Sequence, residues 1–278
     1  MSTADVQLSV GEHATTPVGP GGPSGRSRNI RVEQIMGTTI SLDLRDPAVS
    51  PAAVDAAFDH LRDIDARFST YRPDSEISRL GWGELSADSC SPDVREVLER
   101  CESLRALSLG YFDIRAHRAD GRLDPSGFVK GWAVEAAAGI LDAAGARNYC
   151  LNAGGDVIAR GEPAPNRPWR IGIRHPELAD RVATVIEASE LAVATSGAYE
   201  RGEHITEPRT GRAPDGVLSL TVVGARLSEA DAYATAAYAM GPVGLAWIDT
   251  LPGYAGCMIT ADRRLVWTPQ FARYKTAS

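Results

Sequence analysis

Two oxygen-bearing side chains stand four residues apart in a segment that otherwise consists mainly of small apolar residues. They are Asp231 and Thr235, within LSEADAYATAAYAMG, residues 227–241. If this segment is a helix packed into a core, the spacing places both side chains on one helical face. A buried carboxylate is costly unless a charged or hydrogen-bonding group meets it. A hard cation such as Mg²⁺, which takes oxygen ligands, would be such a partner.

The same residues also have a purely structural interpretation. Ser228 to Asp231 has the S-x-x-D form of a capping box at the start of a helix. The hydroxyl of Thr235 could bond back to the carbonyl of Asp231 within the same helix. The segment alone leaves the metal site and the capping arrangement both open.

A second candidate segment is GRLDPSGFVKGWAVEAA, residues 121–137. Here Asp124, Ser126 and Gly127 precede a helical pattern, and a glycine-bearing turn that leads into a helix can present backbone N–H groups to an anion. Lys130 would add positive charge at the same place. The structural alternative is that Asp124 or Ser126 caps the helix while Lys130 is solvated.

Two further segments place glycine or polar residues where a core would not favour them. In LNAGGDVIARG, residues 151–161, two glycines and Asp156 follow an apolar strand. They allow a ligand or a second backbone to approach closely, or they form a tight bend in a sheet. The loop ATSGAYERGEHITEPRTGRAP, residues 194–214, has His204 in its middle. It is either the rim of a ligand site or an ordinary solvated loop.

The elements that must position these residues follow from periodicity and turn signals. β-Branched and apolar residues alternate on both sides of Gly37, which predicts a hairpin or a bent strand. Ser50 and Pro51 start an amphipathic helix whose apolar stripe ends at Phe68. Further helices are predicted at about 91–109, 127–144, 227–241 and 242–250, and short strands within 148–197, 216–225 and 255–269. Strands and helices mix without a βαβ rhythm, which predicts an α+β fold.

Composition narrows the classes of function. The chain has 278 residues, 44% of them hydrophobic, and a net charge of −7. No basic stripe is visible, so we expect no nucleic-acid partner, and no apolar run is long enough for an integral membrane segment. Residues 1–28 are rich in Gly, Pro, Ser and Thr and are predicted to be a disordered arm before one domain at 29–278. No secretory signal or lipid-attachment cysteine is visible at the start, which predicts a cytoplasmic protein.

The four cysteines are scattered and form no C-x-x-C pair, so neither a zinc site nor a redox motif is indicated. We expect them to be packing thiols in a reducing compartment.

Taken in order, these segments resemble the ApbE family of FAD:protein FMN transferases. The matching runs cover nearly the whole chain after residue 30. They are MGTT (36–39), FSTYRPDSEISRL (68–80), GYFDI (110–114), LDPSGFVKGWAVE (123–135), LNAGGDV (151–157), ATSGAYERGEHITEPRTG (194–211) and ADAYATAAY (230–238).

The resemblance implies an α+β, T-fold-like, two-lobed single domain that holds the flavin in a cleft between its lobes. It also implies a Mg²⁺-dependent enzyme. Such an enzyme splits the pyrophosphate of FAD, moves the FMN half onto a Thr hydroxyl of an acceptor flavoprotein and releases AMP.

Carried over by position, Asp231 and Thr235 match the metal-binding side chains of the family, and the backbone carbonyl of Gly127 matches a third ligand. His204 matches the histidine of an H-x-x-D-P segment and, like Asp231, is a candidate base for the attacking Thr. Positions that line the FAD match Met36, Tyr71, Phe112, Asp113, Asp124, Lys130 and the backbone of Ile205 and Thr206. Of these, Tyr71 or Phe112 could stack on the isoalloxazine.

The chain departs from the family pattern at several points. Glu207 stands where Asp is usual, so no catalytic part is assigned to it, and Arg115 replaces a usual Thr. The segment between Asp113 and Asp124 is shorter than is typical. Two other functions stay open: an FAD pyrophosphatase that gives FMN and AMP, and a non-catalytic FAD-binding protein.

Overall fold

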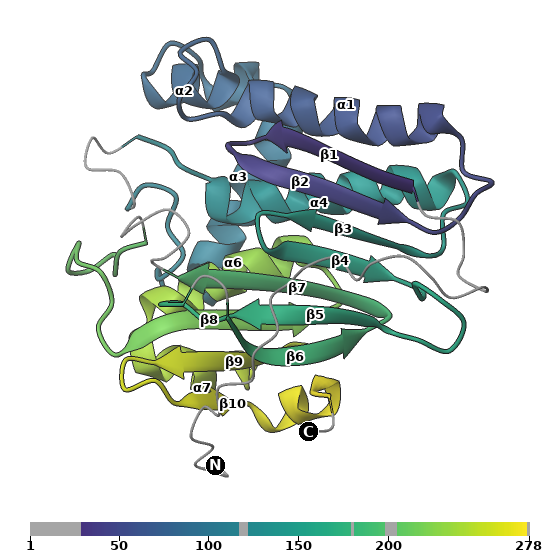
Figure 1. Ribbon diagram of the computed structural model, residues 1–278. Coiled ribbons are helices and arrows are strands. Elements are labelled where there is room, and N and C mark those ends of the chain that lie inside the picture. Colours follow the sequence, from purple (N-terminus) through teal and green to yellow (C-terminus); the bar gives the residue numbers. More distant parts are fainter. Residues whose placement is uncertain (1–28, 117–121, 179–180, 198–204, 277–278) are drawn as a thin grey trace.

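A computed structural model of the chain describes residues 29–116, 122–178, 181–197 and 205–276 (Figure 1). The predicted arm at 1–28 and the predicted acid/base residue His204 lie outside the described residues. The following description concerns the described ranges alone.

An antiparallel sheet forms the centre of the fold. It begins with the predicted hairpin, whose two strands are joined by Met36 and Gly37, both at positive φ (56° and 69°). Two-residue connections of this kind match the right-handed twist of the paired strands. Within the described residues the sheet has eight strands in the order β1-β2-β3-β4-β7-β8-β9-β10. Their bounds are β1 (Asn29–Ile35), β2 (Thr38–Leu44), β3 (Tyr149–Ala153), β4 (Asp156–Arg160), β7 (Glu190–Gly197), β8 (Val217–Gly224), β9 (Ala255–Thr260) and β10 (Leu265–Trp267).

Both faces of this sheet are covered, which explains why its central strands are apolar on both sides. Side chains such as Ile158 point toward the helices, and their neighbours such as Val157 point toward a small second sheet. That second sheet pairs β5 (Trp169–Arg174) with β6 (Val182–Ala188), and Figure 1 shows it in front of the central strands.

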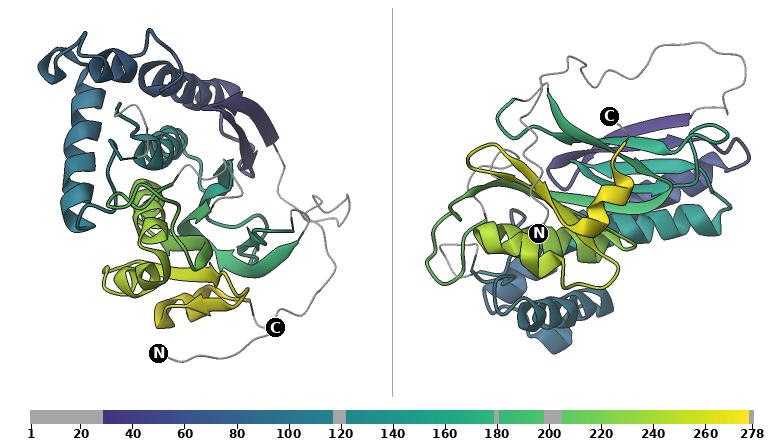
Figure 2. Two further views of the ribbon diagram at one scale, coloured as in Figure 1. Left: turned by 90° about the vertical axis from the view of Figure 1, so that its left-hand side faces the viewer. Right: turned by 90° about the horizontal axis from the view of Figure 1, so that it is seen from below.

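The helices form a layer on the other face. Their bounds are α1 (Pro51–Phe68), α2 (Glu76–Gly81), α3 (Pro92–Leu107), α4 (Ser126–Ala143), α6 (Leu227–Ala239) and α7 (Gly244–Ile248). Of these, α4 and α6 pack against each other and against the sheet, and α1 packs across α4 and the β1–β2 hairpin. Figure 2 shows α3 on the outside of this layer. Short 3₁₀ turns lie at Ala87–Ser89, Gly241–Val243 and Pro269–Tyr274.

The first helix shows how local sequence fixes an element. The hydroxyl of Ser50 accepts the backbone N–H of Ala53 at 3.3 Å, and Pro51 occupies the first turn. The predicted apolar stripe is the buried one and ends at Phe68. Phe68, at the end of α1, forms part of the wall of a pocket.

The predicted α+β class is confirmed. The helix α2 was not predicted, because six residues are too few to show helical periodicity. Residues 151–161 form two antiparallel strands, β3 and β4, joined by Gly154 and Gly155. In the part of the chain that the structure describes, every helix is too short or too polar to cross a bilayer.

The cysteines behave as ordinary packing residues. All four are free thiols, and Cys90, Cys101 and Cys257 are buried. Burial raises the pKa of Cys101, Cys150 and Cys257 to about 12. A thiol with so high a pKa carries almost no thiolate at neutral pH and is a poor nucleophile.

Candidate active site

The N-terminal halves of α4 and α6 lie against each other, and glycines on α4 make this approach possible. A Cβ atom added at Gly131 would lie 2.6 Å from the carbonyl oxygen of Leu227. One added at Gly127 would lie 2.9 Å from Oγ1 of Thr235. The two glycines are one helical turn apart, and so are the α6 residues Asp231 and Thr235 that face them. The predicted metal-binding residues are therefore brought together.

Asp231 is only 3% exposed, and its carboxylate is directed at α4. Its Oδ2 atom accepts the backbone N–H of Gly131 at 3.1 Å. In a regular α-helix that N–H bonds to the carbonyl four residues earlier, which here belongs to Gly127. Asp231 is therefore bonded to α4 one helical turn after Gly127.

The capping interpretation of Asp231 is wrong. The cap residue of α6 is Arg226, which makes no side-chain capping bond. The beginning of α6 is capped by the neighbouring helix, because Oε2 of Glu135 accepts the N–H of Ser228 at 3.0 Å and its hydroxyl at 2.7 Å. A carboxylate near the first N–H groups of a helix stabilises that helix end. Glu135 therefore caps the beginning of α6, which is the role that the S-x-x-D pattern predicted for Asp231.

Lys130 lies between two buried carboxylates. Its ammonium nitrogen forms an ion pair with Asp156 and lies 3.4 Å from Oδ2 of Asp231. Asp156 is held by β7 as well, because its Oδ1 accepts the N–H of Thr195 at 3.1 Å. The lysine is thus a half-buried, paired charge, and its interpretation as a solvated side chain is wrong.

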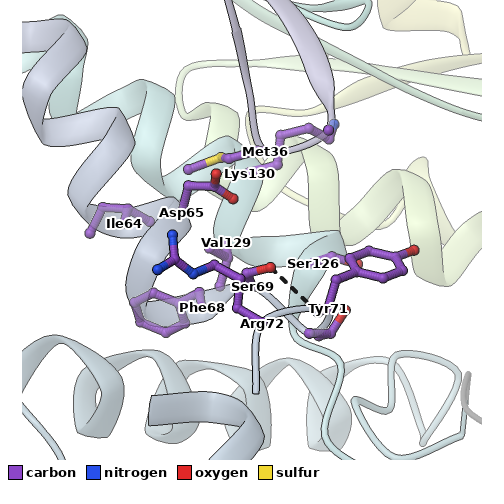
Figure 3. Close-up of a pocket in the computed structure, with 12 residues that line it drawn as sticks. Met36, Ile64, Asp65, Phe68, Ser69, Tyr71, Arg72, Ser126, Val129 and Lys130 are labelled. Atoms are coloured by element: carbon purple, nitrogen blue, oxygen red, sulfur yellow. Dashed lines mark hydrogen bonds between the residues drawn. The ribbon is translucent and has the colours of Figure 1, made fainter. Parts of the chain in front are cut away.

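A pocket of about 500 Å³ opens beside this cluster. Its lining comes from the β1–β2 turn, the end of α1, the segment that follows α1 and the start of α4 (Figure 3). The lining residues are Met36, Gly37, Ile64, Asp65, Phe68, Ser69, Thr70, Tyr71, Arg72, Ser126, Val129 and Lys130. Such a volume is typical of a small-molecule or cofactor site.

Several predicted FAD-lining residues meet at this pocket. The turn with positive φ projects Met36 over the opening, and Lys130 forms the wall nearest to Asp231. Tyr71 stands at the rim with 91% of its surface exposed, and its N–H donates to Oγ of Ser69 at 3.4 Å (Figure 3). An exposed ring at a pocket mouth is available to stack on a planar ligand.

The three predicted FAD-lining residues that precede α4 are engaged in contacts within the protein. Phe112 is 3% exposed, and its ring packs in the core, so its faces are not free for stacking. Asp113 accepts the Nε–H of Arg105 at 3.3 Å and the N–H of Arg115 at 2.9 Å. Asp124 accepts the N–H of Ser126 at 3.1 Å, a local bond just before α4, whose cap residue is Pro125. Any contact of these three residues with FAD stays a prediction.

The loop after β7 is described from Ile205 onward. Ile205 is buried, and the hydroxyl of Thr206 is buried without a hydrogen-bond partner among the described residues. The carboxylate of Glu207 accepts the hydroxyl of Thr210 at 2.8 Å within its own turn.

Two acidic residues at the site received no role from the sequence. Asp156 follows the Gly154–Gly155 turn, and the sequence feature that could have indicated a role for it was a single Asp at the start of an apolar strand. Asp65 lies on α1 within a pattern that showed only amphipathicity, and Figure 3 shows its carboxylate directed into the pocket near Met36.

The fold and the site together define an α+β protein in which oxygen-bearing side chains of α6 and the ammonium group of Lys130 lie beside a cofactor-sized pocket. Comparison with known proteins gives the family: the sequence profile of the ApbE family matches residues 36–120 and 115–259. The chain belongs to the ApbE family.

Relatives and solved structures agree with this. The FAD:protein FMN transferase of Vibrio cholerae is 28% identical in an alignment of 265 residues that covers 74% of this chain and 79% of that protein. The one from Rhodobacter capsulatus is 33% identical in an alignment of 186 residues that covers 64% of this chain and 35% of that protein. The crystal structure of the ApbE protein from Thermotoga maritima superposes with a TM-score of 0.79 at 20% identity, covering 90% of this chain and all of that one. The flavin transferase ApbE from V. cholerae gives a TM-score of 0.77 at 24% identity, covering 89% of this chain and all of that one.

Proposed function

We propose that this chain is an FAD:protein FMN transferase that uses Mg²⁺ held by Asp231, Thr235 and the carbonyl of Gly127. It moves the FMN half of FAD onto a threonine hydroxyl of an acceptor protein and releases AMP. The observation that carries this proposal is the close packing of α4 on α6, which sets Gly127 against Thr235 and brings Asp231 next to Lys130, a residue that lines a cofactor-sized pocket. Membership of the ApbE family and the activity named for its relatives support it.

The donor set fits Mg²⁺. It consists of a carboxylate, a hydroxyl and a carbonyl, all hard oxygen donors, and Mg²⁺ typically keeps several waters or substrate phosphates beside one or two carboxylates. Among the described residues no group of three or more His, Cys, Asp or Glu could hold a metal ion, so a zinc-like centre has no support there. When bound, Mg²⁺ supplies neutralisation of the pyrophosphate charge and polarisation of its P–O bonds.

The side chains of the chain itself supply position and charge. Lys130 and the N-terminus of α4 place positive potential where the pyrophosphate would lie. The acceptor hydroxyl attacks the phosphorus of the FMN half, its O–P bond forms, the anhydride bond breaks and AMP leaves. Asp231 or His204 takes the proton of the hydroxyl, a step typically worth about 10²–10⁴ in rate.

The pocket favours the uncharged parts of the dinucleotide. Phe68, Met36 and Val129 give it an apolar wall, and Tyr71 at the rim can cover a ring. The carboxylate of Asp65 would repel a phosphate but accepts hydrogen bonds from N–H or O–H groups. A ring system with its hydroxyls therefore lies in the pocket, and the phosphates lie toward Lys130.

The test is mass spectrometry of a candidate acceptor flavoprotein co-expressed with this chain. The proposal predicts a mass gain of one FMN residue on a threonine, which disappears in an Asp231→Asn variant. Incubation of the purified chain with FAD and Mg²⁺ alone separates the alternatives. Rapid stoichiometric AMP release without acceptor would point to the pyrophosphatase, and FAD left intact with every acceptor would point to a non-catalytic FAD-binding protein.

A further inference from the structure

Asp156 is the most buried charged group at the site, and the proposed reaction gives it no part. Its side chain is 1% exposed, compared with 15% for Lys130 and 5% for Asp231. Two aspartates thus share one lysine ammonium, and Asp156 makes the closer contact. Buried charges are normally paired, so the unequal sharing needs a physical account.

The three side chains come from three different elements. Lys130 is on α4, Asp231 is on α6, and Asp156 is the first residue of β4. The second oxygen of Asp156 is fixed by the N–H of Thr195 in β7, so this carboxylate cannot follow the lysine. The sheet therefore provides a fixed anchor that draws the ammonium group away from α6.

This anchor matters because Lys130 and a divalent cation compete for the same carboxylate. An ammonium ion placed fully on Asp231 would form a neutral buried pair, and a metal ion would have to break that pair before it could bind. At 3.4 Å the ammonium is a neighbour of Asp231, while its main partner is Asp156.

We propose that Asp156 is a positioning residue that holds Lys130 beside Asp231, so that the ammonium group does not displace a divalent cation from the Asp231 carboxylate. The inference rests on the proposed function, which places Mg²⁺ at Asp231. It adds that Mg²⁺ binding requires Asp156, a residue to which the proposed function gives no contact with the metal or the FAD. It also explains why a buried carboxylate stands directly after the Gly154–Gly155 turn.

The test measures binding of Mg²⁺ alone to the purified full chain by isothermal titration calorimetry, without FAD. In Asp156→Asn the amide oxygen can still accept the Thr195 N–H, but the attraction for Lys130 is lost. The ammonium then moves to Asp231, and Mg²⁺ binding should weaken about tenfold or more. The double variant Asp156→Asn with Lys130→Met removes the competitor and should restore binding to within about threefold of the wild type.

Asp142→Asn is the matched control. Asp142 lies on the same helix, about 18 Å from Lys130 at 1.5 Å per residue. Its Oδ1 accepts the hydroxyl of Tyr149 at 2.8 Å, which an asparagine oxygen also accepts. Mg²⁺ binding should be unchanged in this variant. Asp156→Ser, which removes the same charge and keeps a hydroxyl acceptor, provides a second reading if Asp156→Asn does not fold by circular dichroism.

Two results would overturn the inference. One is a folded Asp156→Asn or Asp156→Ser variant that binds Mg²⁺ within twofold of the wild type. The other is a double variant as weak as the single one, because Asp156 would then shape the site without acting through Lys130. A wild-type chain that binds no Mg²⁺ overturns the metal assignment and this inference together, while FMN transfer to the acceptor is read separately by mass spectrometry.

Discussion

Replacing Gly131 by alanine should separate the helices that carry the site. The added Cβ would lie 2.6 Å from the Leu227 carbonyl oxygen and 3.0 Å from Cβ of Asp231. The first contact is backbone, which cannot rotate away, so the first turn of α6 has to shift. Overpacking of this kind costs about 1–3 kcal/mol. Alanine recovers about 1 kcal/mol of helix propensity, and weakening the bond from the Gly131 N–H to a charged carboxylate costs roughly 1 kcal/mol more.

The net expectation is a loss of about 2 kcal/mol in the free energy of unfolding. A matched control exists on the same helix, because Gly139 is exposed and a Cβ there has nothing within 4 Å. Gly139→Ala should stabilise the chain by up to about 1 kcal/mol. The two variants should therefore differ by roughly 3 kcal/mol in urea unfolding, and only Gly131→Ala should lose Mg²⁺ affinity and FMN transfer.

The reasoning would be refuted by a Gly131→Ala protein that is as stable as Gly139→Ala and transfers FMN at the wild-type rate. That result would mean that α6 can move away from α4 at no cost and that the site does not depend on their separation. A Gly131→Ala protein that is destabilised but transfers FMN at the wild-type rate would refute only the claim that the site depends on the separation of the two helices.

Three further predictions concern other parts of the chain. In Gly127→Ala the three atoms nearest to the added Cβ belong to the side chain of Thr235, with Oγ1 at 2.9 Å, so the change should displace that hydroxyl with little change in unfolding midpoint. Mg²⁺ binding should weaken about tenfold by calorimetry, a loss of about 1.4 kcal/mol, and unchanged affinity would exclude Thr235 as a ligand. Burial lowers the pKa of His60 below its ordinary 6.5. Below pH 6.5 the unfolded chain therefore binds more protons than the folded chain, and the free energy of unfolding falls as the pH decreases. His60→Gln should flatten this dependence of stability on pH, and an unaltered dependence would contradict the burial of His60. Cys101, whose pKa is about 12, should react with a thiol reagent at pH 8 only after denaturant is added, and labelling of the native chain at that residue by peptide mapping would contradict its burial.

Local periodicity was enough to predict most of the elements and part of the site. The spacing of Asp231 and Thr235 fixed their common helical face without knowledge of any other element. In the same way, Ser50, Pro51 and the apolar stripe to Phe68 determined α1. These signals lie within one or two helical turns, where sequence distance and spatial distance are closely related.

The remaining features depend on contacts between distant segments. Asp156 and Lys130 are 26 residues apart and belong to a strand and a helix, so no spacing rule joins them. The capping of α6 by Glu135, 93 residues before Ser228, made the S-x-x-D pattern misleading in the same way. A short sequence pattern indicates which hydrogen bonds a segment could make by itself. Contacts with distant segments determine which bonds it makes in the folded protein.

The packing of α4 on α6 and the assembly of the cation site are one and the same contact. Gly127 and Gly131 repeat every four residues on α4, and Thr235 and Asp231 repeat every four residues on the facing side of α6. Four-residue ridges of two helices interlock when the residues at the crossing are small. Because each glycine faces one of the two oxygen-bearing side chains, a side chain added at either position would displace one of the proposed metal ligands. The proposed site therefore depends on the absence of side chains on α4 as much as on the polar side chains of α6.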